Sequence, residues 1–425
     1  MFNVNLRKLV ITAVGFLVLT SLIACSTDGD NGEDNGQVTL TVWSTSDQLE
    51  LFVAGFEAQN PDITVDLQVL PNDGYLTRLL TTLNSGQNAP DVFTAESDYV
   101  RRLVNTTFMA DLSEAPFNFD NEEAGLWEYV VDIGTDLNGV IRALSWQASP
   151  GGIIYRTDLA ERYLGVSSPE EMSALLTSTQ GMLEVAARLR ENDIVMFASW
   201  EDLFNMEFSN RESGWVVDNT LVIDENMEIF METARTIVTN GYSLNVSPWD
   251  AEWIAAVNAD NVFSYVLPTW GYQFVVRANA DATIGDWGLA ETPHPYVRGG
   301  TWLGIYAESE NQEAAWRFME YVTINQEAQI AFSEETGEYM SVRAVGEFFA
   351  AGEGEEVLGG QNAQAFYNHQ MSKGIPALMT AYDGPINDAF LAATRLYVQG
   401  TMTREEALES FRLDVRTAFP DLVVE

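Results

Sequence analysis

Strand and helix patterns alternate in the chain after residue 37, and this alternation constrains the fold more than any other feature. Three short apolar runs have the character of strands, and between them lie two runs with apolar residues three and four apart, as in helices. In chain order these five runs occupy residues 38–43, 49–56, 63–69, 76–83 and 91–94. The order β-α-β-α-β predicts a parallel, doubly wound sheet with ligand sites beyond the carboxyl ends of its strands.

The length of the chain indicates two lobes. About 388 residues follow residue 37, which is too many for one ordinary hydrophobic core. Hydrophobic residues make up 46% of the sequence, enough for globular folding. A strand pattern at 139–146, a Ser-Pro-Gly-Gly break at 149–152 and a second strand pattern at 153–159 are typical of a crossover between lobes.

The charge of the chain excludes several classes of partner. The sequence holds 63 Asp plus Glu against 21 Lys plus Arg, a formal net charge of -42. Phosphate backbones and anionic lipid surfaces repel such a protein, so nucleic acid is not expected as a partner. A saline habitat and compositional drift explain the acidic surface equally well, so the charge does not indicate a function.

The first 24 residues have the parts of a secretory signal peptide. Two basic residues at 7–8 precede an apolar run at 9–19, which is shorter than the roughly 20 residues that span a bilayer. Residues 22–25, Leu-Ile-Ala-Cys, resemble the bacterial lipobox, which implies cleavage before Cys25 and acylation of its thiol. A plain signal peptide with an incidental cysteine is the alternative.

The segment that begins at Cys25 supports a membrane anchor. Residues 25–37 contain no large apolar side chain, so we expect a flexible linker behind the lipidated N-terminus. Two or more acyl chains hold a protein stably on a membrane. We therefore expect an exported protein, anchored to the outer face of the cell membrane or in the periplasm. With its only cysteine acylated, the chain would form no disulfide.

Five segments carry the motifs of a known family in the correct order. They include an "aPDv" strand, a "lyYNkdl" crossover, a segment ending in "GxW" and a "GGxxlai" strand with the helix that follows it. The five segments lie at residues 56–65, 89–92, 154–159, 265–270 and 300–318. Together they resemble family 1 extracellular solute-binding proteins, the sugar-binding lipoproteins and maltose-binding-like receptors of ABC importers.

The resemblance implies the two-lobed, type II fold of periplasmic binding proteins. In that α/β fold each lobe is a mostly parallel sheet flanked by helices, and the ligand cleft lies between the lobes. We expect the N-lobe at 38–147 plus 296–340 and the C-lobe at 148–295 plus 341–425. Ligand closes such lobes by hinge bending, because it contacts both only when they are shut.

The resemblance also implies a function without chemistry on the ligand. The chain would capture an extracellular solute, above all a mono- or oligosaccharide, and deliver it to the ABC permease subunits in the membrane. No enzymatic activity, metal or cofactor is expected, and we expect a monomer.

Sugars present apolar C–H faces and hydroxyl edges, so their sites combine aromatic plates with carboxylates and amides. Trp270 lies where the family's "GxW" tryptophan stacks on sugar, although this chain reads Pro268-Thr269-Trp270 there. The resemblance therefore implies a stacking role for Trp270, and a core position is the alternative.

Carboxylates follow the first and third predicted strands. Asp47 lies after the first strand, where the family often has a polar ligand contact, and Asp98 lies after the third with Glu96 beside it. We expect all three in the cleft. A helix N-cap is the alternative for Asp47 and for Asp98.

Two more tryptophans are candidates, one of them at the expected crossover between the lobes. Trp146, beside Gln147, ends the strand pattern before the Pro-Gly-Gly break, and we expect it to contact the cleft. Trp302 follows Gly299-Gly300, where the absence of side chains lets another group approach closely. We include Trp302 among the ligand-binding candidates.

The remaining candidates come from the second half of the chain. Trp249 and Trp253 are four residues apart, so both could share one helix face, with one in the site and the other packed. Tyr382 and Asp383 match a region that supplies an aromatic contact in sugar-binding relatives.

Other functions remain open at this point. A secreted enzyme with a Ser-His-Asp triad would have only His294 or His369 available, and no Gly-x-Ser-x-Gly elbow precedes either. One cysteine and two distant histidines also make no zinc cluster. A sensory or adhesive binding lipoprotein on the same fold is an alternative, as is an importer receptor for a polyamine or another cation.

Overall fold

The computed structural model describes residues 37–375 and 378–425. The predicted signal peptide, Cys25 and all of the linker except Gln37 lie outside the described residues, so export and lipidation stay predictions. Within the described ranges, no helix is both long and apolar enough to cross a membrane.

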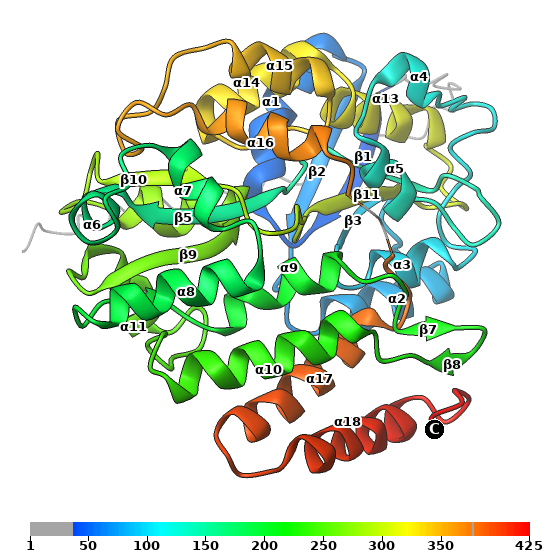
Figure 1. Ribbon diagram of the computed structural model, residues 1–425. Helices are drawn as coiled ribbons and strands as arrows, with labels where there is room; N and C mark the ends of the chain where they lie inside the picture. Colours follow the sequence, from blue (N-terminus) through cyan, green and yellow to red (C-terminus); the bar gives the residue numbers. More distant parts are fainter. Residues whose placement is uncertain (1–36, 376–377) are drawn as a thin grey trace, which may run out of the picture. The chain divides into compact units, whose positions relative to one another are not determined.

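The first sheet holds five strands in the order β2-β1-β3-β11-β4 (Figure 1). They are β1(Val38–Ser44), β2(Ile63–Val69), β3(Val92–Glu96), β4(Ala143–Ser145) and β11(Thr301–Ile305). β1 runs parallel to β2 and β3, as the β-α-β-α-β pattern predicts, and β11 runs antiparallel to β3 and β4. The connecting helices α1(Glu50–Gln59) and α2(Tyr75–Ser85) lie where the helical spacing predicts them.

Local interactions fix the strands of this sheet beside one another. Helix α2 buries Tyr75, Leu79 and Leu83 on one face and ends at Gly86, whose left-handed φ of 64° suits a helix C-cap. Asp91, just before β3, accepts a hydrogen bond from the backbone N–H of Thr41 in β1 at 2.9 Å. As a result, the carboxyl ends of β1 and β3 meet at the same edge of the sheet.

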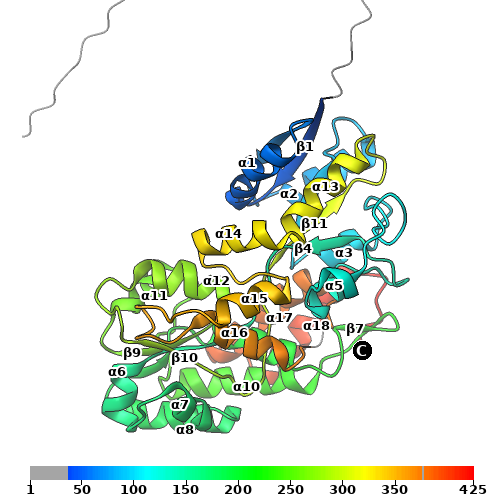
Figure 2. The ribbon, with the colours of Figure 1, turned by 90° about the horizontal axis from the view of Figure 1, so that it is seen from above.

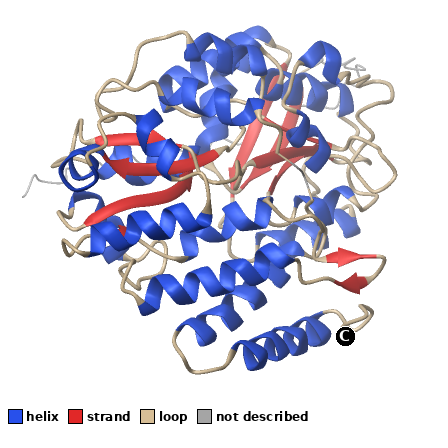
Figure 3. Ribbon diagram, in the orientation of Figure 1, coloured by secondary structure: helices blue, strands red, loops and turns tan. Residues whose placement is uncertain are grey.

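The second sheet has the order β10-β5-β9-β6. It contains β5(Gly151–Arg156), β6(Val195–Phe197), β9(Val262–Pro268) and β10(Trp287–Ala290). β9 and β10 both run antiparallel to β5, and β6 runs parallel to β9. The expected α/β class is confirmed, with helices flanking both sheets (Figure 3). The prediction of a mostly parallel arrangement is wrong for this second sheet. Side-chain spacing identifies a strand, but the direction of the strand in the sheet depends on a partner far along the chain.

Strand β9 is buried along its whole length because both of its faces are covered. Phe263 packs into a core cluster shared with α8(Thr179–Arg190), α10(Glu225–Thr239) and α17(Asp383–Val398). Tyr265, from the same strand, belongs to a second cluster that continues into the first sheet. The hydrophobic core therefore extends across the junction between the sheets.

The remaining elements complete the layers around the two sheets. Figure 2 shows β1, α2 and α13 in one part of the molecule and β9, β10, α7 and α8 in another. The other elements are α3(Val100–Val104), α4(Asn121–Ala124), α5(Glu128–Ile133), α6(Thr157–Leu159), α7(Pro169–Leu175), α9(Phe204–Ser209), β7(Val216–Val217), β8(Thr220–Leu221), α11(Ala251–Ala255), α12(Thr269–Gly271), α13(Gln312–Thr323), α14(Gln326–Thr336), α15(Arg343–Ala350), α16(Ala363–Ser372) and α18(Arg404–Ala418).

Segments that pass between the two sheets lie against one another. Isolated antiparallel bridges join Gln147 to Met340 and Pro150 to Val297. Gly299 has a φ of 82°, and a Cβ placed there would lie 2.8 Å from Nε1 of Trp270. The close approach expected at this glycine pair is therefore confirmed, and the group that approaches is the Trp270 indole.

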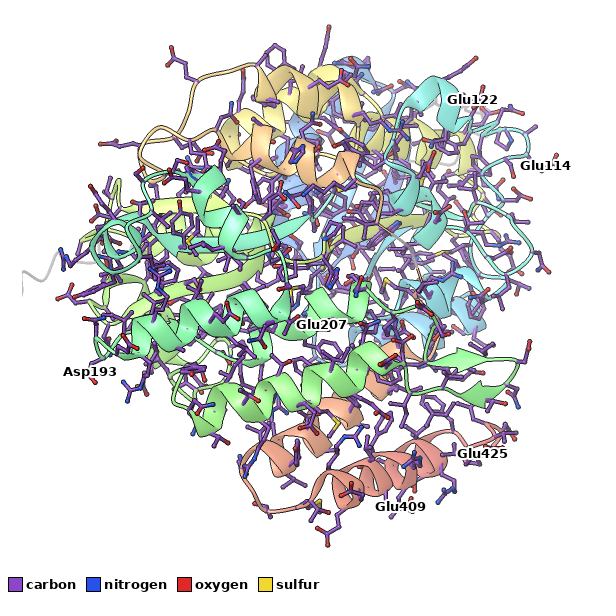
Figure 4. All side chains as sticks on the ribbon, in the orientation of Figure 1. Glu114, Glu122, Asp193, Glu207, Glu409 and Glu425 are labelled. Atoms are coloured by element: carbon purple, nitrogen blue, oxygen red, sulfur yellow. The ribbon has the colours of Figure 1, made fainter. Side chains whose placement is uncertain are left out.

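Acidic side chains project widely from the surface, as the net charge requires. Glu114, Glu122, Asp193 and Glu409 are exposed, and Figure 4 shows them at the periphery. Glu207 differs from them because it is buried in α9, where burial raises the pKa of its carboxyl. Its side chain accepts a hydrogen bond from the Thr179 hydroxyl at 3.1 Å.

We expect Gly134→Ala to destabilise the fold by about 2 kcal/mol, the usual cost of forcing extra atoms into a packed site. Gly134 follows α5, and a Cβ there would lie 1.9 Å from the backbone oxygen of Ala143. Urea unfolding measures the loss. Gly352→Ala is the matched control, because this exposed glycine has no positive φ and the nearest atom to a Cβ there is the Phe349 backbone oxygen at 3.1 Å. Equal losses in the two variants would show that the close contact is not the cause.

Candidate functional site

A cavity of about 550 Å³, here called the main chamber, lies beyond the carboxyl ends of β1 and β3. Its walls come from the loops after these two strands, from segments that pass between the sheets, and from a group of aromatic side chains. The lining residues are Thr45, Ser46, Asp47, Gln48, Asn72, Glu96, Ser97, Asp98, Tyr99, Gln147, Trp249, Trp270, Phe274, Arg298, Gly299, Gly300, Thr301 and Glu338. The main chamber thus lies at the sheet edge that the strand order predicts.

The loop after β1 holds two carboxylates of the main chamber, the half-buried Glu96 and the buried Glu338, by neutral hydrogen bonds. The Thr45 hydroxyl donates to Glu96 Oε1 at 2.6 Å, and the Gln48 amide donates to Glu338 Oε1 at 3.2 Å. Ser46 caps the following short helix, because its hydroxyl accepts from the Gln48 backbone N–H. The loop therefore positions side chains from two distant parts of the chain.

Burial dominates the electrostatics of these two carboxyl groups. It raises the pKa of Glu96, although the hydroxyls of Thr45 and Thr301 donate to the carboxylate and oppose the shift. Burial also raises the pKa of Glu338 to about 7, against one opposing hydrogen bond from Gln48. Both groups therefore sit in surroundings that disfavour negative charge.

Three aromatic side chains form one wall of the main chamber. Trp249 stacks on Trp270 with ring centroids 5.6 Å apart and an interplanar angle of 16°. Trp249 is 54% exposed and Phe274 is 49% exposed, so both present large apolar area to the chamber. The Trp270 indole is held by the segment before β11, because its N–H donates to the Arg298 carbonyl at 3.0 Å.

Trp249 adopts a backbone conformation that bulky residues rarely use. It follows Pro248 in a turn closed by a hydrogen bond from the Asp250 N–H to the Ser247 carbonyl, and its φ is 72°. Positive φ at this turn position is normally taken by glycine or asparagine. A non-glycine residue there carries strain of about 1 to 3 kcal/mol, a feature that clusters at functional sites.

A second cavity of about 220 Å³, here called the side chamber, adjoins the main chamber. The two share Ser97, Asp98, Arg298 and Gly299 in their walls. On the far side, Asp388 of α17 lines the side chamber, and burial and the nearby Asp98 raise the pKa of its carboxyl. Among the described residues, no group of three or more His, Cys, Asp or Glu side chains is placed to hold a metal ion.

Five of the predicted site residues are brought together in the wall of the main chamber: Asp47, Glu96, Asp98, Trp249 and Trp270. Ligand contact by any of them stays a prediction. Asp47 is exposed, and the helix cap considered as its alternative is supplied by the neighbouring serine.

Trp146 and Trp302 do not reach the main chamber, and their placement in the cleft was wrong. Both are fully buried in the core, and the Trp302 indole donates to the Val130 carbonyl at 2.8 Å. Consecutive residues of an extended chain point to opposite sides. The neighbours Gln147 and Thr301 line the chamber instead, one position away from each prediction.

Tyr382 and Asp383 also lie outside both chambers, which corrects their prediction. Tyr382 packs edge-on against Phe419 with centroids 5.1 Å apart. Asp383 is 2% exposed and lies 3.7 Å from the buried guanidinium of Arg211. These two residues stabilise the junction of α17 with neighbouring segments rather than facing a solute.

Trp253 packs in the core, and its indole donates to Asp202 Oδ2 at 3.1 Å. Trp249 precedes α11, so the two tryptophans do not share a helix face, although one lines the chamber and the other packs as expected.

Sequence reasoning missed several residues of the main chamber. Phe274, Arg298 and Thr301 lie close in sequence to predicted positions, so neighbouring positions could have been included. Glu338 had no such signal, because it is one of 63 acidic residues and follows an ordinary helix. Its role in the chamber depends on tertiary structure.

Comparison with known proteins gives the family and the fold. A family model described as bacterial extracellular solute-binding protein matches residues 52–345. A solved structure of an extracellular solute-binding protein family 1 superposes with a TM-score of 0.77 at 18% identity, covering 90% of this chain and 99% of that one. The sugar-binding protein MalE from Xanthomonas citri gives 0.74 at 18% identity, covering 90% and 98%. These neighbours confirm the two-lobed α/β fold.

Two further relatives have names that mention a ligand or a transporter. The galacto-N-biose-/lacto-N-biose I-binding protein of Bifidobacterium longum, solved with lacto-N-biose, gives a TM-score of 0.74 at 13% identity, covering 92% of this chain and 100% of that one. The putative ABC transporter periplasmic-binding protein YcjN of Escherichia coli (strain K12) is 25% identical over 182 residues. That match spans 40% of this chain and 41% of YcjN.

Proposed function

Because the chain belongs to the bacterial extracellular solute-binding proteins, we propose that it captures a mono- or oligosaccharide outside the cell and delivers it to the permease of an ABC importer. The protein binds its solute without chemistry and without a metal or cofactor. It acts as a monomer, held near its permease by acylated Cys25.

The observation that carries the proposal is the composition of the main chamber. The stacked Trp249 and Trp270 offer an aromatic plate for the C–H face of a sugar ring, and Phe274 adds exposed aromatic area. Glu96, Glu338 and the amide of Gln147 supply acceptors and donors for hydroxyl groups. A volume of about 550 Å³ suits a small ligand, since such sites span roughly 300 to 1,000 Å³.

Lobe closure is the second part of the proposal. The main chamber is lined from the first sheet by the loops after β1 and β3, and from the second sheet by Trp270 after β9. Segments that pass between the sheets form the rest of the wall. With lobes at 38–147 plus 296–340 and 148–295 plus 341–425, a bound solute contacts both and favours the closed arrangement. The permease then receives the closed form.

A panel of mono- and oligosaccharides, tested by thermal unfolding of the purified protein, checks this proposal. A solute that binds only the folded state at ten times its Kd stabilises the protein by about 1.4 kcal/mol. We expect at least one sugar to raise the unfolding temperature, with a shift that grows with sugar concentration. If no sugar shifts the transition while an amino acid, peptide or metal ion does, the carbohydrate proposal is wrong. Sustained release of cleaved sugar would contradict the absence of chemistry.

A further inference from the structure

The lining of the main chamber is strongly unbalanced in charge. Four carboxylates, those of Asp47, Glu96, Asp98 and Glu338, line it together with one basic side chain, that of Arg298. None of these five forms an ion pair within 4.0 Å in the described part of the chain. Water can solvate the exposed Asp47 and Asp98, but Glu338 is buried and Glu96 is half-buried.

Glu338 is the least solvated of the four. Its residue is 1% exposed, although it lines the chamber. Oε1 accepts one hydrogen bond, from the neutral amide of Gln48 at 3.2 Å, and Oε2 accepts none from the described residues. A buried carboxylate is normally paired with a cation or fully hydrogen-bonded, because desolvation otherwise costs several kcal/mol. One oxygen of this buried, chamber-lining carboxylate is therefore left without a partner among the described residues.

Glu96 has a hydrogen-bond partner on each oxygen, but both partners are neutral. Its two oxygens accept from the hydroxyls of Thr45 at 2.6 Å and Thr301 at 3.0 Å, and neither donor carries charge. Tyr99 also lines this chamber, and its enclosed hydroxyl has no hydrogen-bond partner in the described residues. Glu96 therefore also lacks a positively charged partner among the described residues.

Arg298 does not supply the missing positive charge. Its guanidinium lies over the Trp270 ring, 5.4 Å from the ring centroid, on the aromatic wall. Its backbone carbonyl is occupied by the Trp270 indole N–H at 3.0 Å. The side chain also borders the side chamber, so it is positioned between the two cavities rather than beside Glu338.

We propose that the solute carries a protonated amine, as an amino sugar or an amine-bearing glycoside does, and that Glu338 and Glu96 hold this amine while the sugar ring lies on the aromatic wall. This inference rests on the proposed carbohydrate function and narrows its substrate class. An ammonium group has three hydrogen-bond donors and a positive charge. It can donate to the oxygen of Glu338 that has no partner, and it can place a positive charge beside Glu96, whose hydroxyl partners are neutral.

The test compares sugars that differ in one substituent. Binding is measured by calorimetry for hexosamines, their N-acetyl forms and the parent hexoses in the gluco, galacto and manno series, as mono- and disaccharides, with spermidine as an amine without a ring. Glu338→Gln keeps the size of the side chain and the acceptor for Gln48 but removes the charge. Glu335→Gln, at an exposed position of α14, is the matched control.

We expect the amine form to bind about thirtyfold tighter than its hydroxyl partner, and Glu338→Gln, unlike Glu335→Gln, to abolish that preference. Equal binding of a hexose or an N-acetyl form overturns the charge inference and leaves the carbohydrate function standing. A preference that survives in Glu338→Gln also overturns it. Binding of spermidine without any sugar supports the amine site and overturns the carbohydrate function. If nothing in the panel binds, both are wrong.

Discussion

Trp249→Gly is expected to weaken sugar binding about a hundredfold and to leave the free energy of unfolding within about 1 kcal/mol of the parent protein. The indole is 54% exposed and stacks on Trp270 with nearly parallel planes, so it offers a plate that a sugar ring would cover on binding. Removing a central aromatic anchor costs 2 kcal/mol or more in binding, and each 1.4 kcal/mol is tenfold.

Stability should change little because two effects oppose each other. The substitution removes the aromatic contacts of Trp249 with Trp253 and Trp270, each worth about 0.5 to 1.5 kcal/mol. It also relieves a φ of 72°, which glycine adopts without strain. The loss of binding would therefore be local to the site.

Calorimetric titration with a sugar that binds the parent protein, together with urea unfolding, separates the two readouts. Phe348→Ala is the matched control, because Phe348 is 55% exposed but lines neither chamber. Unchanged affinity in Trp249→Gly would remove the aromatic plate from the proposed site. A large loss of stability would place Trp249 among the packing residues instead.

Asp202→Asn is expected to stabilise the protein by about 4 kcal/mol at alkaline pH and to have little effect in acid. Asp202 is 1% exposed, its Oδ2 accepts from the Trp253 indole, and its Oδ1 has no partner in the described residues. Burial raises the pKa of its carboxyl from 3.8 to about 7. The charged form is therefore the costly one in the folded protein.

The direction in which stability changes with pH follows from the number of protons bound to the folded and unfolded states. Between pH 3.8 and about 7 the folded state keeps a proton on Asp202 that the unfolded state has lost, so stability falls as pH rises through this window. Below it both states are protonated, and above it both are ionised with the full penalty present. A shift of about three pKa units corresponds to about 4 kcal/mol. Asparagine keeps the indole acceptor and carries no charge.

Urea unfolding across this pH range measures the difference between the variant and the parent protein. The gain should grow from near zero in acid to its full size above neutrality. Asp193→Asn serves as the control, because the Asp193 side chain is 96% exposed. A gain that is the same at every pH would show that removing the charge is not its cause.

The elements that could be predicted from the sequence are those defined by local spacing. The strands β1, β2 and β3 and the helices between them bury the side chains that period two and the helical repeat place on one face. Because parallel strands end at one sheet edge, Asp47 and Asp98 were correctly placed together in the wall of one cavity. This inference needed no knowledge of the second sheet.

The site residues that were wrongly predicted or missed share a different cause. Their surroundings are set by contacts with residues far away in the sequence. Trp146 and Trp302 lie on extended segments whose two sides are covered unequally, and only tertiary structure decides which side faces the chamber. Glu338 reaches the chamber through a contact with Gln48, far away in the sequence. The positive φ of Trp249 had no signal, because its turn contains neither glycine nor asparagine at that position.

The hydrogen bond from the Trp270 indole to the Arg298 carbonyl has a mechanical consequence. An aromatic ring held only by side-chain packing can tilt on its own, but this ring is tied to the main chain of a segment that connects the sheets. In the proposed lobe closure, a rotation of one sheet against the other would change the tilt of the ring, and a solute that fits one tilt would favour one rotation. If a solute rotates the sheets in this way, the emission of the stacked Trp249 and Trp270 should change with the rotation.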